Sequence, residues 1–369
     1  MKSLYVHIPF CKQKCLYCDF NSYSGKENLI DSYCEALKKE LQSYSFNEFQ
    51  TVYFGGGTPS IIPAEKIEEI LKLVKCKGEI TLELNPGTIT EEKLIKYKNI
   101  GINRLSIGLQ ATQDSILKEI GRIHTLKEFE EAFNMARRVG FDNINVDLMF
   151  GLPKQTLKDL EKSVEYLINL NPEHISCYSL ILHKPIFQDL PNDEEERRMY
   201  YLIQKRLKEA GYEQYEISNF SKVGRESKHN LCYWNQEEYI GIGAGASSYL
   251  DQKRYINENK IETYINKINQ NEIWYTIEEE QDFETKIREY IILRLRLLEG
   301  VSKEAVYKKF GVDVLVYFKN EIEKMIQLGL LEMIEENLIN ENNEQVVNTW
   351  IRLTEKGLDF ANIVWEEFI

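Results

Sequence analysis

The first 182 residues alternate between short strand-like runs and longer stretches with helical periodicity. Apolar, β-branched and aromatic runs predict six strands, over residues 3–9, 51–56, 80–86, 104–110, 143–151 and 174–182. Between them apolar residues recur every three or four positions, as in Ile30, Tyr33, Leu37 and Leu41. Strands that alternate with helices favour parallel pairing with right-handed crossovers. The pattern therefore predicts an α/β fold, either an open doubly wound sheet or a partial barrel.

The pattern changes after residue 183. An acidic, proline-containing connection precedes a helix expected at about 194–210, and residues 211–249, rich in Gly, Tyr and Ser, predict strands and loops. From about residue 280 the sequence predicts two helices, a hairpin and a final helix, an order that resembles a winged-helix module. The expected domains are a core over 1–220, a linking segment over 221–280 and a C-terminal domain over 281–369.

The charge of the chain limits its partners. The formal net charge is −13, and residues 281–369 hold 11 Lys and Arg against 17 Asp and Glu. An acidic winged-helix-like domain is disfavoured as a DNA reader. No apolar run approaches the roughly 20 residues of a membrane helix, and the first apolar run is too short for a signal peptide. These features predict a cytoplasmic protein that binds no nucleic acid and is not integral to a membrane.

Three cysteines, Cys11, Cys15 and Cys18, fall within eight residues directly after the first expected strand. A structural zinc site needs four ligands. The nearest extra candidate is His7, and the sequence has no second C-x2-C or H-x3-H pair. A redox dithiol of Cys15 and Cys18 would leave Cys11 unexplained. A [4Fe–4S] cluster normally takes four thiolates, so a cluster held by these three would leave one iron open to another ligand.

The ends of the later expected strands carry glycines and polar side chains. Ligand sites in parallel βα folds gather at these ends. GGGTPS follows the second strand, and missing side chains let its backbone approach a ligand. Glu83 ends the third strand and suits a ribose or an ammonium group, Gln110 ends the fourth, and Asp147 lies in the fifth. Arg122 is a cation that can pair with a carboxylate. Each of these features alone has an ordinary structural explanation. Because they recur together with the ends of successive strands, they indicate a ligand site.

The segment CKQKCLYC resembles the cysteine motif of the radical S-adenosylmethionine (SAM) superfamily, and YVHIPFC, YFGGGTPS, GINRLSIGLQ, GRIHT and NVDLMFGLP resemble its coproporphyrinogen-III-oxidase-like branch. The resemblance implies a partial (βα)6 TIM-like barrel, a [4Fe–4S] cluster on the three cysteines, SAM on the open iron, and an electron donor to the cluster. The implied SAM contacts are Tyr5, Tyr17, Gly56, Gly57, Thr58, Glu83, Gln110, Arg122 and Asp147. The run GIGAGA at 241–246 matches a stretch near SAM in the family.

Two subtypes of this branch differ in function. The oxygen-independent coproporphyrinogen III oxidases decarboxylate two propionates. They typically carry a cysteine where this chain has Phe20, behind a longer N-terminal extension. The HemW-type heme chaperones bind heme, pass it to respiratory heme proteins, membrane-bound enzymes among them, and carry an H-N-x-x-Y-W motif. Phe20 and the segment HNLCYW at 229–234 favour the chaperone subtype, so no catalytic residue is assigned.

The heme contacts that the motif implies are His229, Asn230, Tyr233 and Trp234. Imidazole is an axial ligand of heme iron, and aromatic rings can pack on a porphyrin. A separate hypothesis places the heme propionates on the local cations Lys222, Arg225 and Lys228, although a solvated loop explains this run equally well. Three rival readings stay open: the oxidase, another radical SAM enzyme that transfers methyl groups or opens heme, and a zinc-stapled binding protein.

Overall fold

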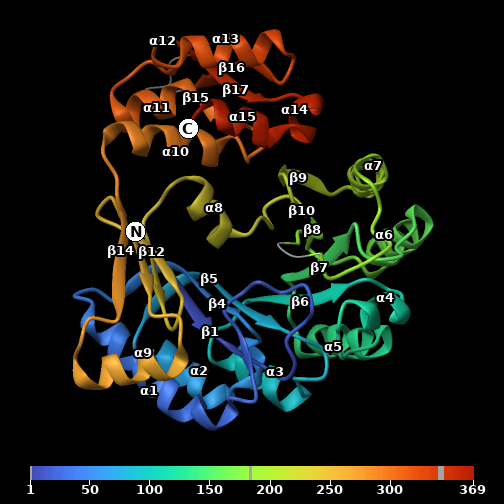
Figure 1. Ribbon diagram of the computed structural model, residues 1–369, viewed down its shortest axis with the longest axis vertical. Helices are drawn as coiled ribbons and strands as arrows, with labels where there is room; N and C mark the ends of the chain where they lie inside the picture. Colours follow the sequence, from blue (N-terminus) through green and yellow to red (C-terminus); the bar gives the residue numbers. More distant parts are fainter. Residues whose placement is uncertain (1, 183–184, 340–344) are drawn as a thin grey trace. The chain divides into compact units, whose positions relative to one another are not determined.

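The computed structural model describes residues 2–182, 185–339 and 345–369 (Figure 1). The chain divides into two compact units, here called the first and the second unit. The first unit comprises Met1–Glu213, Ser218–His229 and Glu237–Glu280, and the second comprises Gln214–Ile217, Asn230–Gln236 and Gln281–Ile369. The segment 221–280, expected as a link, therefore supplies most of its residues to the first unit.

Six parallel strands form the centre of the first unit and pair in chain order. They are β1 (Lys2–Ile8), β4 (Glu48–Gly56), β5 (Lys75–Leu84), β6 (Arg104–Gln110), β7 (Ile144–Phe150) and β8 (His174–Ser179). All six expected strands are confirmed. The largest difference is in β5, which begins five residues before the expected start at 80, because its first residues pair with Glu48 and Phe49 of β4.

Helices follow each of these strands, as the βα pattern predicts. They are α1 (Ile30–Ser43), α2 (Ala64–Leu71), α3 (Glu91–Asn99), α4 (Asp114–Glu119), α5 (Leu126–Val139), α6 (Leu157–Leu170) and α7 (Asp193–Glu209), with short 3-10 turns η1 (Glu27–Leu29) and η2 (Pro59–Ile61). Thr156 and Asp159 form a capping box at the start of α6. At the start of α3, the Thr90 side chain accepts from the Lys93 amide.

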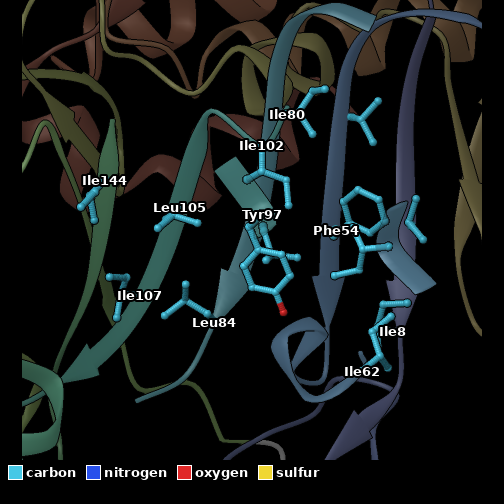
Figure 2. Packing of buried hydrophobic residues seen from close by; sticks show 14 of the residues in the cluster. Ile8, Phe54, Ile62, Ile80, Leu84, Tyr97, Ile102, Leu105, Ile107 and Ile144 are labelled. Carbon is cyan, nitrogen blue, oxygen red and sulfur yellow. The ribbon is translucent and has the colours of Figure 1, made fainter. Parts of the chain in front are cut away.

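The strands have one apolar and one polar face because neighbouring residues point to opposite sides of a sheet. The apolar face packs against the helices, and Figure 2 shows Phe54, Leu105 and Ile107 of the strands together with Tyr97 of α3. Each buried Leu, Ile or Phe contributes about 1.5–3 kcal/mol. The alternate residues form what we call the polar face. It comprises Ser3, Tyr5, His7, Thr51, Tyr53, Glu79, Thr81, Glu83, Arg104, Ser106, Asn145, Asp147, His174 and Ser176.

Further strands extend the sheet of the first unit on both sides of this centre. β11 (Tyr239–Ile242) pairs parallel with β1, and antiparallel strands β12 (Ser247–Leu250), β13 (Lys253–Asn257) and β14 (Tyr275–Glu280) follow it. β10 (Asn219–Ser221) pairs antiparallel with β8. Helix α9 (Ile261–Gln270) packs on α1. A short helix, α8 (Lys228–Trp234), occupies part of the region where only strands and loops were predicted, so that prediction was wrong there.

The second unit has its own apolar core, formed among others by Phe318, Ile322, Ile351 and Val364. Its elements are β9 (Glu213–Glu216, of which Glu213 belongs to the first unit), α10 (Phe283–Arg294), β15 (Val301–Ser302), α11 (Lys303–Phe310), α12 (Val314–Tyr317), α13 (Lys319–Gln327), β16 (Leu331–Ile339), β17 (Gln345–Leu353), α14 (Glu355–Asp359) and α15 (Ala361–Glu367). The expected order of helices, hairpin and closing helix is present, with more and shorter helices than predicted. Among the described residues, no helix is both long and apolar enough to cross a bilayer.

Candidate cluster and cofactor site

The three cysteines lie on one loop that backbone pairing closes at its base. Cys11 ends the short strand β2 (Phe10–Cys11), which pairs with β3 (Tyr23–Ser24) in parallel. Within the loop the Cys18 amide donates to the Cys15 carbonyl across 3.2 Å. Leu16 and Phe20 of this loop are exposed, whereas Cys11 is buried. The loop therefore holds its thiols near the end of β1 on a closed base.

Each thiol has a polar neighbour, and all three are free of disulfides. Sγ of Cys11 lies 3.8 Å from Oγ1 of Thr58, and Sγ of Cys18 lies 4.0 Å from Oγ of Ser22. Nη1 of Arg122 donates to Sγ of Cys15 across 3.6 Å. Hydrogen bonds to sulfur are one means by which proteins tune iron–sulfur clusters.

The described residues contain no group of three or more His, Cys, Asp or Glu side chains close enough together to hold one metal ion. An iron–sulfur cluster spreads its cysteine ligands over several irons, and three thiols on a closed loop match such a donor set.

The GGGT turn after β4 packs directly on the cysteine loop. The amides of Gly57 and Thr58 donate to the carbonyls of Ile8 and Phe10 across 2.9 and 2.8 Å. A Cβ on Gly57 would lie 2.7 Å from the Phe10 oxygen and 3.0 Å from Sγ of Cys11. Gly56 has a φ of +114°, which L residues rarely adopt. Glycine is required at both positions for the turn to reach the loop.

Glu83 is a half-buried carboxylate on the polar face of β5. It accepts hydrogen bonds from the Tyr53 hydroxyl at 2.8 Å and from the Gly56 amide at 3.3 Å. Burial, together with the nearby carboxylate of Asp147, raises the pKa of Glu83 to about 7. Such a group can be ionised near neutral pH and would gain from a cationic ligand.

Asp147 and Tyr5 both belong to the polar face, on β7 and β1. Asp147 of β7 accepts from Nδ2 of Asn145 at 2.7 Å, and burial raises the pKa of its carboxyl. The Tyr5 hydroxyl lies 3.1 Å from Nδ1 of His7, whose Nε2 lies 2.8 Å from the Asn21 carbonyl oxygen. Tyr5 thus belongs to a hydrogen-bonded chain that reaches the end of the cysteine loop.

Gln110 and Arg122 leave buried polar atoms without a hydrogen-bond partner in the described structure. These atoms are Oε1 of Gln110 and Nε of Arg122. Gln110 has a φ of +63°, an uncommon conformation for a residue with a side chain. A buried polar atom without a partner costs about 1–3 kcal/mol. The Gln110 acceptor and the Arg122 donor could therefore each form a hydrogen bond with a polar ligand bound beside them.

Sequence reasoning missed Asn85, which links the parts of this site. Its Nδ2 donates to Oγ1 of Thr58 at 2.8 Å, and its Oδ1 accepts from Nη2 of Arg122 at 2.6 Å. Its position two residues after Glu83, in LELNP, is the signal that could have found it. Tyr17 of the cysteine loop packs with Tyr178 against a small apolar cluster on α4. The structure therefore brings together the residues expected to bind a cluster and SAM.

The GIGAGA run contacts the cysteine loop from the side of β11, which pairs with β1 opposite β4. The Ala244 carbonyl accepts from Nδ2 of Asn21 at 2.9 Å, and the Gly243 amide donates to Glu40 at 2.8 Å. Glu40 is fully buried and also accepts from Tyr264 and Trp274. Burial raises the pKa of Glu40 to about 7. Glu40 is a structural carboxylate that the sequence pattern did not indicate.

The HNxxYW segment contributes residues to both units. His229 belongs to the first unit, and Asn230, Tyr233 and Trp234 belong to the second. The His229 side chain is buried, with Nδ1 2.7 Å from Oγ1 of Thr51. The Trp234 indole lies under the Arg296 guanidinium, whose carbon is 4.4 Å from the ring centroid.

The three cations expected near heme propionates have different surroundings. Nζ of Lys222 lies 3.7 Å from Oε1 of Glu173, and Nη2 of Arg225 lies 3.6 Å from Oδ2 of Asp142. Lys228 is exposed at the start of α8. Lys222 and Arg225 therefore each already have an acidic neighbour.

Comparisons with known proteins agree with this geometry. Residues 5–167 match the model of the radical SAM superfamily, and residues 282–340 match that of the HemN C-terminal domain. The chain is 37% identical to the heme chaperone HemW of Bacillus subtilis over 100% of this chain and 99% of the relative. It is 33% identical to the heme chaperone HemW of Escherichia coli over 100% and 98%. The chain belongs to the HemW family of radical SAM proteins.

A solved structure related to the HemW family supports the fold. The coproporphyrinogen III oxidase HemN of Escherichia coli aligns with a TM-score of 0.85 over 99% of this chain and 89% of that chain. Its sequence identity is 22%, so this likeness shows the fold alone. This likeness confirms the predicted fold, and the family-model and HemW matches confirm the family that the cysteine motif indicated.

Proposed function

We propose that this protein is a cytoplasmic heme chaperone that binds heme and delivers it to heme-requiring proteins, respiratory enzymes among them. The observation that carries the proposal is full-length similarity, at 33–37% identity, to relatives named heme chaperone HemW. Full-length coverage matters because a shared core alone would support only the superfamily. The presence of the cysteine loop and the polar strand ends supports a SAM- and cluster-binding core within this chaperone.

The proposed [4Fe–4S] ligands are Cys11, Cys15 and Cys18. Three ligands leave one iron for SAM, and a bound cluster would supply one-electron chemistry. Around it, Arg122 would stabilise the charge at Cys15, and the Gly57 turn would keep the backbone close. The remaining proposed SAM contacts are Tyr5, Tyr17, Gly56, Thr58, Glu83, Gln110 and Asp147. We also propose a partner that donates the electron to the cluster.

The proposed heme contacts lie on the HNxxYW segment, in Asn230, Tyr233 and Trp234. His229 is 1% exposed, so its imidazole could ligate heme iron only in a state in which the first turn of α8 leaves the polar face. Lys228 is the third proposed contact for a propionate. To bind a propionate, Lys222 would have to leave Glu173, and Arg225 would have to leave Asp142.

A heme titration of the anaerobically reconstituted protein tests this function. The proposal expects saturable binding with a defined Soret band at one heme per chain. The same preparation, given coproporphyrinogen III, SAM and a one-electron reductant, should leave the carboxyl groups of the porphyrinogen intact. Loss of those carboxyl groups would identify an oxidase instead.

A further inference from the structure

The first turn of α8 enters the polar face of the first unit and is fixed there by Glu79. The backbone amides of Lys228 and His229 both donate to this carboxylate, each across 3.2 Å. Oε2 of Glu79 lies 3.9 Å from Nε of Arg104, a guanidinium that is 2% exposed. Thr81 also donates to Glu79, at 3.4 Å. A buried anion with these donors sets the position of the His229 backbone.

The His229 imidazole is held at both its edge and its face. Oγ1 of Thr51 donates its proton to Oγ of Ser3 at 2.9 Å, so it accepts from Nδ1 of His229 at 2.7 Å. The ring stacks on Tyr53, with 5.1 Å between centroids and an interplanar angle of 30°. Burial, together with the Arg104 charge, lowers the pKa of His229 to about 3, so the ring is neutral at pH 7.

Tyr53 connects this imidazole to the proposed SAM site. One face of its ring packs on His229, and its centroid lies 6.1 Å from that of Tyr5 in a stacked arrangement. Its hydroxyl donates to Oε1 of Glu83 at 2.8 Å. The Tyr5 and His229 centroids are themselves 6.5 Å apart, so the three rings contact one another. Glu83 therefore has its orientation set by a phenol that packs on both His229 and Tyr5.

We propose that His229 is a positioning residue for SAM binding, acting through Tyr53 on Glu83. The inference rests on the SAM-binding part of the proposed function. Removing the imidazole would leave a void beside the Tyr53 ring and free it to change rotamer. Glu83 would then lose its fixed donor, and the carboxylate would no longer be oriented in advance for its ligand.

SAM binding to the anaerobically reconstituted protein, measured by equilibrium dialysis, tests the inference. His229→Ala should weaken SAM binding about tenfold, and Tyr53→Phe should weaken it comparably. Because both act through one side chain, the double variant should lose little more than either single variant. His229→Gln keeps a flat group and a donor for Thr51 and should recover most of the affinity. If the fold-loss of SAM affinity in the double variant equals the product of the two single fold-losses, the inference is overturned.

Two controls separate this role from general instability and from heme ligation. Leu94→Ala removes a buried side chain of α3, away from the polar face, and should lower the denaturation midpoint without changing SAM affinity. A His229→Ala variant with wild-type SAM affinity and a shifted Soret band would overturn the inference and leave the chaperone intact. Failure of the wild type to bind SAM would overturn both the inference and the SAM part of the proposed function.

Discussion

Arg122 donates a hydrogen bond to the sulfur of Cys15 across 3.6 Å, joining the loop after α4 to the cysteine loop 107 residues away. The same guanidinium reaches Asn85, which in turn reaches Thr58 of the glycine turn. One cation thus connects the ends of β4 and β5 to the proposed cluster ligands. This relationship explains why residues scattered over the sequence form one site.

Substituting any one of Cys11, Cys15 and Cys18 by alanine should abolish cluster assembly, because the loop offers the cluster no further cysteine. The measurement is iron and sulfide content after anaerobic reconstitution, together with the broad absorption near ~400 nm. Cys76→Ser is the matched control, since Cys76 is a partly buried free thiol on β5 outside the loop. A full complement of iron in any of the three loop variants would contradict the assignment.

SAM affinity should fall several-fold as the pH drops from 7.5 to 6.0. The pKa of Glu83 is raised to about 7 by burial, so the carboxylate becomes protonated over this range and loses its attraction for a cationic ligand. Glu83→Gln should bind SAM weakly, and its affinity should change less with pH. The variant also serves as the control for protons that SAM itself gains or loses. An equally steep profile in the variant would assign the titration elsewhere, with Asp147 the first candidate.

Glu79→Ala should destabilise the first unit by about 3–5 kcal/mol, because it leaves the buried Arg104 charge and two amides of α8 without their acceptor. The check is the urea midpoint monitored by circular dichroism. Glu65→Ala removes an exposed ion pair with Lys96 and should leave the midpoint nearly unchanged. Equal shifts in both variants would mean that Glu79 does not anchor the helix.

Much of the fold could be predicted from the sequence, because alternation of apolar and polar residues is a local property of a strand. In β4 the order Thr51, Val52, Tyr53, Phe54 already separates a polar from an apolar face. The three cysteines were found for the same reason, since eight residues of chain keep them together. Thr156 and Asp159 likewise form their capping box within four residues.

What could not be predicted depends on partners that are distant in sequence. Helix α8 is only seven residues long, too short for periodicity to indicate, and the carboxylate that fixes its first turn comes from Glu79, about 150 residues earlier. The motif at 229–234 suggested a heme ligand, but nothing local shows that His229 lies against Tyr53. Asn85 was missed because a polar residue after a strand is usually just solvated.

The stability of the wild type should depend on pH through His229. Its pKa is lowered to about 3 by burial, whereas an unfolded histidine titrates near ~6.5. Between these values the unfolded chain binds the extra proton, so this residue's contribution to stability falls as the pH falls, by about 1.4 kcal/mol per pH unit. His229→Gln lacks this pH-dependent contribution to stability, because glutamine does not titrate.

The stability deficit of His229→Gln relative to the wild type should therefore shrink by about 2 kcal/mol between pH 7 and pH 5. Urea unfolding of both proteins at the two pH values measures it. Comparing the two proteins cancels the other buried groups, such as Glu40 and His174, which titrate in both. A deficit that stays constant with pH would show that the imidazole is not buried as described.

The kinetics of heme delivery test the central claim most directly. Heme-loaded protein is mixed with increasing concentrations of an apo heme protein, and transfer is followed by the change in Soret absorption. A chaperone that hands heme over in a complex predicts a transfer rate that rises with acceptor concentration and exceeds the rate of spontaneous heme dissociation. A rate that equals dissociation and does not depend on the acceptor would contradict the account.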